Sequence, residues 1–185
     1  MALTKTPVCE FGKKAEDFKL KSINNKVISL NNIMGEKATL IMFICNHCPY
    51  VKAIIKDLAK DCKELSDEGI SSVAIMSNDP KNYPEDSFDN MIKFAQSNNF
   101  GNINYLFDET QEIARKYGAV CTPDFFGYNR KLELQYRGRF RELKDLKPVN
   151  NDDSDLKIAM KMVAQTQKGP DEQIPSMGCN IKWFN

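Results

Sequence analysis

Two cysteines separated by two residues stand between a strand-like run and a helix-like run, and this arrangement limits the fold more than any other feature of the chain. The pair is Cys45 and Cys48. Residues 38–44 are apolar, β-branched and aromatic enough for a buried strand, whereas residues 51–65 repeat apolar side chains at helical spacing. Pro49 falls in the first helical turn, where a missing N–H does no harm. The sequence therefore predicts a dithiol at a strand-to-helix turn, with Cys45 near the start of the helix.

This position has consequences for the reactivity of Cys45. The unpaired N–H groups and the positive end of a helix dipole favour a thiolate, which is the form of cysteine that attacks disulfides and peroxides. Thiols in such settings titrate between roughly 3.5 and 7.5 instead of near 8.5. We therefore expect Cys45 to be the attacking thiolate. His47, between the two cysteines, either tunes the pair or simply caps the start of the helix.

The composition restricts the class of protein. A chain of 185 residues fits one domain spanning 1–185, with a core at about 15–170 and a tail at 171–185. The net charge is +1 and the charges are interspersed, so no basic face suits a nucleic-acid backbone. The first residues lack a signal-peptide pattern, and no apolar run approaches the roughly 20 residues that span a bilayer. We expect a cytoplasmic protein without nucleic-acid or membrane partners.

Six cysteines in a cytoplasmic protein are not expected to form a structural disulfide framework. A Cys-x-x-Cys pair then points to redox chemistry or to metal binding. A zinc site needs three or four ligands, and the single histidine of the chain is His47, inside the motif itself. The acidic loop at 79–86 lacks the ligand spacing and the glycine of a calcium loop. We therefore expect redox use of the pair, with no metal and no cofactor.

The rest of the chain predicts an α/β layer fold. Residues 18–20 and 27–30 flank the turn residues Asn24 and Asn25, which indicates a hairpin. After Gly69 the run at 70–76 is a second strand, so strand, helix and strand form a parallel crossover unit. The same patterns predict a helix through 88–95 capped by Asp86 or Ser87, a strand at 105–107, a helix at 111–117, a hairpin of 125–128 with 132–136, and a helix at about 155–167.

The segment Cys121-Thr122-Pro123 opens the second predicted hairpin. Pro123 has no N–H to donate to a sheet, so it marks a special backbone position. Composition alone favours a trans bond before this proline.

Taken together, these features resemble a known family. The resemblance is carried by CNHCPYVKA (45–53), SNDPKNYPEDS (77–87), YLFDETQEIARKYGAVCTPDFF (105–126) and GCNIKW (178–183). These stretches are similar to thioredoxin-family proteins termed peroxiredoxin-like, in the alkyl hydroperoxide reductase and thiol-specific antioxidant superfamily, over roughly residues 15–185. The resemblance implies a thioredoxin-like fold, a central mixed β-sheet flanked by helices with an N-terminal hairpin and a C-terminal tail. It also implies a cis bond at Thr122-Pro123 beside the dithiol, and thiol redox chemistry.

The resemblance to true peroxiredoxins is incomplete. Their peroxidatic cysteine lies in P-x-x-x-T-x-x-C and is assisted by a distant arginine, and Cys48 falls on the position of that cysteine. Ile41 stands in place of the proline, Cys45 replaces the threonine, and Pro123 falls about where the arginine comes. Without the hydroxyl and the guanidinium, fast peroxidase chemistry loses its electrostatic transition-state stabilisation.

We therefore predict an oxidoreductase that exchanges thiols and disulfides with a protein or small-molecule partner. In this prediction Cys45 attacks and Cys48 resolves, while Pro123 and the backbone of Thr122 form a shelf on which an extended partner chain can pair as an added strand. One alternative is a slow peroxidase, in which Cys48 reacts with peroxide and Cys45 resolves. Another is a non-catalytic redox sensor or binding module, whose disulfide switches a surface formed by the tail.

The remaining cysteines carry weaker signals. Cys62 lies on the apolar stripe of its helix and is expected in the core, and Cys9 lies in the N-terminal arm with no expected role. Cys121 is either a packed thiol beside the Thr-Pro loop or a third redox thiol. Cys179 either docks with the apolar tail or acts as a resolving thiol, which predicts a disulfide with Cys45 or Cys48.

Overall fold

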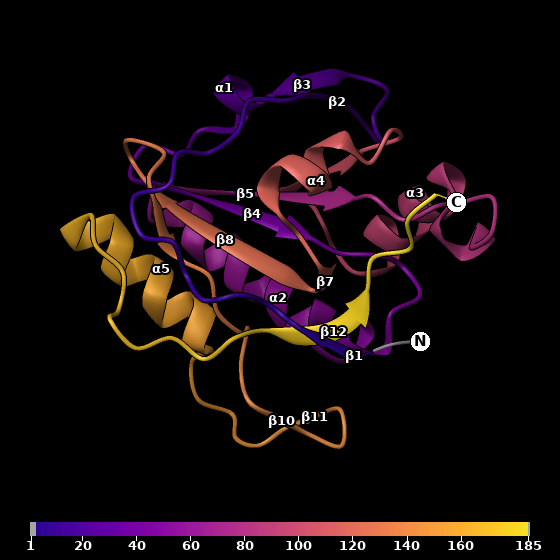
Figure 1. Cartoon of the computed structure of the whole chain (residues 1–185). Coiled ribbons are helices and arrows are strands. Elements are labelled where there is room, and N and C mark those ends of the chain that lie inside the picture. Colours follow the sequence, from indigo (N-terminus) through magenta and orange to yellow (C-terminus); the bar gives the residue numbers. More distant parts are fainter. Residues whose placement is uncertain (1–2, 185) are drawn as a thin grey trace.

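A seven-stranded mixed sheet forms the centre of the computed structural model, which describes residues 3–184 (Figure 1). The strand order is β3-β2-β6-β5-β4-β8-β9, with β4, β5 and β6 parallel and the outer strands antiparallel to their neighbours. A central mixed sheet flanked by helices confirms the predicted α/β class. The strands are β2 (Lys19–Ser22), β3 (Val27–Ser29), β4 (Ala38–Phe43), β5 (Ile70–Met76), β6 (Ile103–Phe107), β8 (Asp124–Asn129) and β9 (Leu134–Tyr136).

The crossover unit predicted around the two cysteines is present. β4 is buried at every position, and β5 pairs with it in parallel from Ala38 opposite Ile70 to Phe43 opposite Ile75. The helix between them, α2 (Pro49–Asp67), packs its apolar stripe against the sheet. Gly69 follows the helix with φ +83°, a conformation that glycine adopts without steric cost.

Most of the other predicted elements also form. The N-terminal hairpin turns at Asn24 and Asn25, and Asn25 has a left-handed φ of 60°. Ser87 is the N-cap of α3, as predicted, and Gly118 closes α4 in the left-handed region. The other helices are α1 (Leu30–Ile33), α3 (Phe88–Ser97), α4 (Glu112–Tyr117) and α5 (Asp155–Thr166), with a short 3-10 turn, η1 (Pro84–Asp86), before α3.

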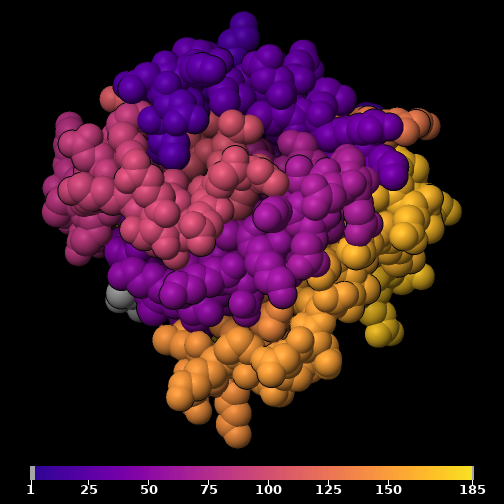
Figure 2. All heavy atoms as spheres, turned by 180° about the vertical axis from the view of Figure 1, so that it is seen from behind, coloured from indigo at the N-terminus to yellow at the C-terminus, as the bar shows by residue number. Residues whose placement is uncertain are grey.

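Two apolar layers hold the helices against the sheet. On one face Leu40 and Met42 belong to the layer that includes α2, α3 and α5, whereas Ile41 and Phe43 face the layer that includes α1 and α4. Successive side chains of a strand point to opposite faces, so β4 is covered on both sides and is apolar throughout. Seen from behind, α2 (purple) and α5 (yellow-orange) form neighbouring parts of the surface (Figure 2).

The tail forms part of a second sheet that the sequence analysis did not predict. Its strand β12 (Met177–Asn180) lies between β1 (Leu3–Lys5) and β7 (Cys121–Thr122) and is antiparallel to both (Figure 1). The tail therefore docks on the body, but as a strand beside the Thr-Pro turn. A further short hairpin, β10 (Leu143–Lys144) with β11 (Lys147–Pro148), projects from the body in both views (Figures 1 and 2).

Crossing a bilayer would require a helix that is both long and strongly apolar, and none of the helices within residues 3–184 meets that description.

Candidate active site

The two cysteines of the motif lie in the loop that leaves the carboxyl end of β4 and enters α2. Pro49 is the first residue of the helix and Cys48 is its N-cap. Cys45 lies three residues earlier, before the helix has begun. Both side chains are buried, with 1% of Cys45 and none of Cys48 exposed.

Cys48 is surrounded by groups that stabilise a thiolate. Its sulfur accepts a hydrogen bond from the Cys45 thiol, and further bonds from the thiol and backbone N–H of Cys179 and from the N–H of Val51. These bonds lower the pKa of Cys48 to about 5, with burial opposing them. The Val51 N–H is one of the free donors of the first helical turn, so the helix start acts on Cys48. When Cys48 is protonated, its thiol donates to the Thr122 carbonyl oxygen at 3.1 Å.

The pKa of Cys45 shifts in the opposite direction. Its thiol is held as the donor to Cys48, it is buried, and the Asp86 carboxylate lies nearby, and together these raise its pKa well above the usual value. The Thr122 hydroxyl, 3.4 Å from the Cys45 sulfur, opposes the shift only in part. The sequence predicted a lowered pKa at Cys45, but the helix begins after Cys48, so its free N–H groups face Cys48 and lower the pKa of that thiol instead.

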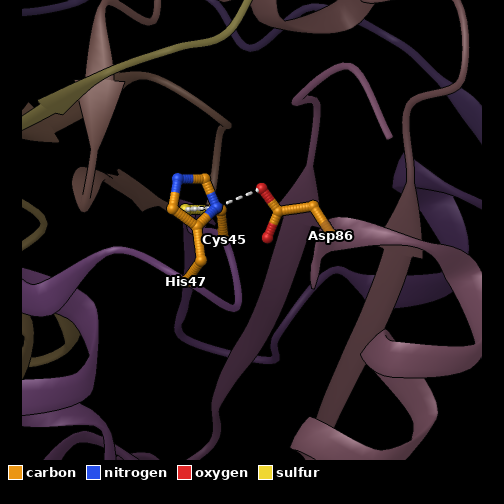
Figure 3. A group of neighbouring side chains, drawn as sticks. All are labelled: Cys45, His47 and Asp86. Carbon is orange, nitrogen blue, oxygen red and sulfur yellow. Dashed lines mark hydrogen bonds and ion pairs between the residues drawn. The ribbon is translucent and has the colours of Figure 1, made fainter. Parts of the chain in front are cut away.

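His47 is paired with a carboxylate that sequence reasoning did not assign to the site. Its Nδ1 lies 2.7 Å from Oδ2 of Asp86, a fully buried side chain from η1 (Figure 3). This hydrogen bond raises the pKa of His47, with desolvation opposing it. The imidazole also stacks on Tyr83, with ring centroids 5.6 Å apart and planes 7° from parallel. His47 is therefore held in one orientation by a charged partner and by an aromatic ring.

Asp86 is in turn fixed by amide donors. The backbone N–H of Asn46 donates to Oδ1 and the side-chain amide of Asn78 donates to Oδ2, each at 2.8 Å. The Asn46 side-chain oxygen accepts from the buried Tyr105 hydroxyl at 2.9 Å. The sequence predicts Asp86 only as a candidate helix cap. No local pattern marks it as a site residue, because it lies 39 residues from His47 in the chain.

Cys45, His47 and Asp86 each bring one potential metal-binding atom to a cluster in which all three atoms lie within 4.8 Å (Figure 3). Sulfur, imidazole nitrogen and carboxylate oxygen are all ligands that zinc accepts. However, the Cys45 sulfur and the Asp86 oxygen approach the same ring nitrogen, at 3.9 Å and 2.7 Å. A proton on Nδ1, shared with Asp86, accounts for the cluster without a metal.

Thr122 and Pro123 lie beside the dithiol, and the bond between them is cis, as the resemblance implied. Their expected use as a shelf for an extended partner needs correction. The edge of β7 is already taken by β12, with Thr122 opposite Cys179 and Cys121 opposite Asn180. The Ser176 hydroxyl also donates to the Pro123 carbonyl at 2.8 Å. Because the chain's own tail covers this edge, no second strand can pair there while β12 is in place.

The other four cysteines divide into two groups. Cys179 lies in the site, with its sulfur 3.1 Å from that of Cys48, and burial raises its pKa to about 12. Cys121 is also buried near the Thr-Pro turn, where its thiol contacts the Pro123 carbonyl oxygen at 3.6 Å and burial raises its pKa. Cys62 belongs to the apolar core, as predicted, and Cys9 is half-buried in the N-terminal arm.

An open groove of about 460 Å³ borders the site on the Pro123 side. Its apolar wall includes Tyr50, Ile54 and Phe140, and Arg139 and Arg141 lie among its charged lining residues. The groove gives a ligand with apolar and anionic parts a route toward Pro123.

Comparison with known proteins identifies relatives of this arrangement. A family model described as the AhpC/TSA family matches residues 11–140. An uncharacterized conserved protein from Geobacillus kaustophilus is 39% identical, with a TM-score of 0.88, and the alignment covers 100% of this chain and 97% of that one. A hypothetical protein from Sinorhizobium meliloti is 35% identical, with a TM-score of 0.89 and 98% of each chain covered.

More distant structures share the fold. The thioredoxin domain of a thiol-disulfide oxidoreductase from Bacteroides vulgatus is 15% identical, with a TM-score of 0.59 over 70% of this chain and 89% of that one. This similarity confirms the predicted thioredoxin-like fold. Among curated proteins, none matches the chain.

Proposed function

Because the chain belongs to the AhpC/TSA family, we propose that it is a thiol–disulfide oxidoreductase whose redox centre is the pair Cys45 and Cys48. The observation that carries the proposal is the hydrogen bond between the two thiols at the start of α2, where the acceptor, Cys48, has a pKa of about 5. Disulfide exchange needs a thiolate with a second thiol in reach, and this pair meets both requirements.

In the proposed cycle, the Cys48 thiolate attacks one sulfur of a partner disulfide. The partner's disulfide bond breaks, its second sulfur leaves and takes up a proton, and Cys48 is left in a mixed disulfide. Cys45 then loses its proton and attacks the Cys48 sulfur, which releases the reduced partner and leaves a Cys45–Cys48 disulfide. The partner gains two electrons and the protein loses two. The reverse sequence oxidises a partner dithiol.

The environment of Cys48 favours the oxidising direction. A thiolate that is stabilised in the reduced protein makes the disulfide form easier to reduce, which raises the reduction potential. The His47–Asp86 pair places a second charged group next to Cys45 and tunes the same balance. We therefore expect a potential toward the oxidising end of the known range, roughly −200 to −120 mV. Equilibration with glutathione buffers, followed by peptide mass spectrometry, measures this potential and identifies the two sulfurs.

A trapping experiment separates the roles of the two cysteines. We expect Cys45→Ser combined with Cys179→Ser to accumulate a mixed disulfide between Cys48 and a partner, because both thiols beside Cys48 are gone, and Cys48→Ser to form none. Cys62→Ser is a matched control, since it changes a buried thiol elsewhere on α2. Accumulation on Cys45 in Cys48→Ser would restore Cys45 as the attacking residue. Full exchange activity in the variant lacking both thiols would refute the proposal.

A second candidate function is a slow peroxidase, favoured by the same low pKa of Cys48. Arg137 is a buried arginine beside the Thr-Pro turn, but its guanidinium is bonded to Asp124 and to the Gly118 carbonyl. In this mechanism the Cys48 thiolate attacks a peroxide oxygen, the O–O bond breaks, and the alkoxide or hydroxide leaves and takes up a proton. The resulting Cys48 sulfenic acid condenses with the Cys45 thiol to a disulfide with loss of water. Stopped-flow peroxide kinetics test it: a rapid reaction in Cys45→Ser that is absent in Cys48→Ser would favour the peroxidase.

The proposed partner is a protein or small-molecule disulfide, and the proposed compartment is the cytoplasm. The glutathione poise of that compartment, about −220 to −260 mV, would keep a pair of the expected potential largely reduced, which is the form that starts the proposed cycle.

A further inference from the structure

Strand β12 occupies the place beside Thr122 that a partner strand would take. It pairs with β7 in antiparallel fashion, with Cys179 directly opposite Thr122. β1 covers its other edge, where Leu3 pairs with Cys179. β12 is thus the middle strand of a small sheet (Figure 1). The thiol of its Cys179 contacts that of Cys48.

The close approach of β12 to the Thr-Pro turn depends on a glycine. A Cβ atom added to Gly178 would lie 2.0 Å from the Thr122 carbonyl oxygen and 3.1 Å from the Pro123 ring. Only a residue without a side chain fits there. The strand can therefore lie against the turn, and Cys179 is brought to a Sγ–Sγ distance of 3.1 Å from Cys48.

We propose that Cys179 is an intramolecular partner thiol of Cys48, carried by a strand of the protein itself in place of an external substrate chain. The step begins with the Cys45–Cys48 disulfide. The proposal rests on the proposed function only in that this function produces the starting disulfide. Cys179 loses its proton and attacks the Cys48 sulfur. The Cys45–Cys48 bond breaks, a Cys48–Cys179 bond forms, and Cys45 leaves and takes up a proton. No electrons are gained or lost in this step.

The transfer has two consequences for the site. It frees Cys45, which becomes available for a new reaction while the protein stays oxidised. It also fastens β12 over Thr122 by a covalent bond, so an extended partner can pair with this edge of β7 only after Cys48–Cys179 has been reduced and β12 has left. A disulfide needs a Sγ–Sγ distance of about 2.05 Å, so the two sulfurs must approach by roughly 1 Å.

The test uses the full chain carrying Cys45→Ser, so that Cys48 cannot pair with its motif neighbour. The reduced variant is treated with one equivalent of dithiodipyridine and digested, and its disulfides are mapped by mass spectrometry. We expect release of both thione halves of the reagent and a Cys48–Cys179 cross-link within single chains. Cys121→Ser in the same background is the matched control, since it removes the other buried thiol beside Thr122 and should leave the cross-link unchanged.

A second variant tests whether the position of β12 against Thr122 is needed for the cross-link. Gly178→Ala, added to Cys45→Ser, pushes β12 away from Thr122 and should slow cross-linking roughly 10–100-fold. Gly101→Ala is the control, because a Cβ at that glycine meets nothing within 4 Å. Equal rates in the two glycine variants would contradict the role of β12.

The proposal is overturned if folded Cys45→Ser retains the reagent on Cys48, or links Cys48 to Cys121 or to another chain. If Cys45→Ser does not fold, the wild-type protein is oxidised and mapped instead, and a disulfide population without Cys48–Cys179 is the overturning result. Failure of the proposed function gives a different pattern, in which the cross-link forms but no partner disulfide is turned over.

Discussion

Two buried carboxylates flank the dithiol region, and they are paired with cations of different kinds. Asp124, at the start of β8, accepts two hydrogen bonds from Arg137, at 3.3 Å and 3.0 Å, and the guanidinium also lies over Phe126. Asp86 accepts from the imidazole of His47. The first pair joins the Thr-Pro turn to the end of β9, and the second joins η1 to the motif.

The electrostatic balance differs between the two pairs. Burial raises the pKa of Asp124 to about 6 in spite of Arg137, so desolvation is the larger effect there. At the other pair the hydrogen bond with Asp86 raises the pKa of His47, so pairing is the larger effect. An arginine stays charged at all relevant pH values, whereas a histidine can lose its charge. The comparison suggests that one pair fixes structure and the other can respond to conditions.

The largest expected effect is from removal of the permanent cation. Arg137→Met leaves Asp124 buried without its partner and should lower the free energy of unfolding by about 3–5 kcal/mol. Arg139→Met is the control, because Arg139 is 23% exposed and its partners Asp155 and Glu142 lie at the surface, where such pairs contribute at most about 1 kcal/mol. Urea denaturation of both variants checks the difference. Similar losses in the two would show that the Asp124 pair is not special.

The raised pKa of Asp124 predicts a pH dependence of the same pair. A carboxyl whose folded pKa is raised contributes stability below its unfolded pKa of 3.8, and this contribution is lost as pH rises through about 6. The difference in unfolding free energy between wild type and Asp124→Asn should therefore change by roughly 2 kcal/mol between pH 4 and pH 6.5. Denaturation curves across this range measure it. A difference that stays constant with pH would mean that Asp124 is ionised throughout.

At the other pair, Asp86→Asn removes the charge that holds the imidazolium. The pKa of His47 should return toward or below 6.5, and the protein should lose about 2 kcal/mol of stability, since a hydrogen bond to a charged group is lost. His47 is the single histidine in the chain, so one NMR resonance reports the titration. Because the wild-type pKa is raised, the stabilising effect is present below pH 6.5 and is lost as pH rises through the folded pKa.

Cys48 makes the unfolding free energy depend on pH in the opposite sense to His47. Its pKa is lowered from 9.0 to about 5, so its stabilising contribution is present above pH 9 and is lost as pH falls through 5. Asp86 also raises the pKa of Cys45, so the NMR titration of His47, and not the stability difference alone, isolates the histidine. An unchanged histidine pKa in Asp86→Asn would remove Asp86 as its partner.

The smallest expected effect concerns the ring on which His47 stacks. Tyr83→Leu keeps an apolar side chain at this position but removes the parallel ring, and should cost about 0.5–1.5 kcal/mol. The pKa of His47 should change less than in Asp86→Asn, because the carboxylate remains. A larger pKa change in Tyr83→Leu than in Asp86→Asn would reverse the order of the two contacts.

The elements that were predicted correctly are those whose signals are local. β4, β5 and α2 have strong apolar periodicity, and Ser87 and Gly118 mark helix boundaries by their intrinsic preferences. The small sheet was missed because β1, β7 and β12 are two to four residues long. Their pairing joins segments that are distant in the chain, which periodicity does not reveal.

The candidate site shows the same division. Both cysteines, His47 and the Thr-Pro turn were found from motif and resemblance, but Asp86 lies 39 residues from His47 and reaches it only through the folded loop. The position of the helix start relative to the two cysteines can be read from the sequence. Proline is favoured at the first helical position, and this preference at Pro49 already indicates Cys48 as the N-cap.

The position of β12 also has a consequence for how the protein matures. Cys48 and Cys179 are 131 residues apart in the chain. During synthesis, which proceeds from the N-terminus, the β4–α2–β5 unit can fold well before residues 177–180 leave the ribosome. Until then, Cys48 lacks the two donors that Cys179 supplies, and its thiol remains a weaker acid. The nascent chain therefore carries a dithiol that is less reactive than that of the finished protein.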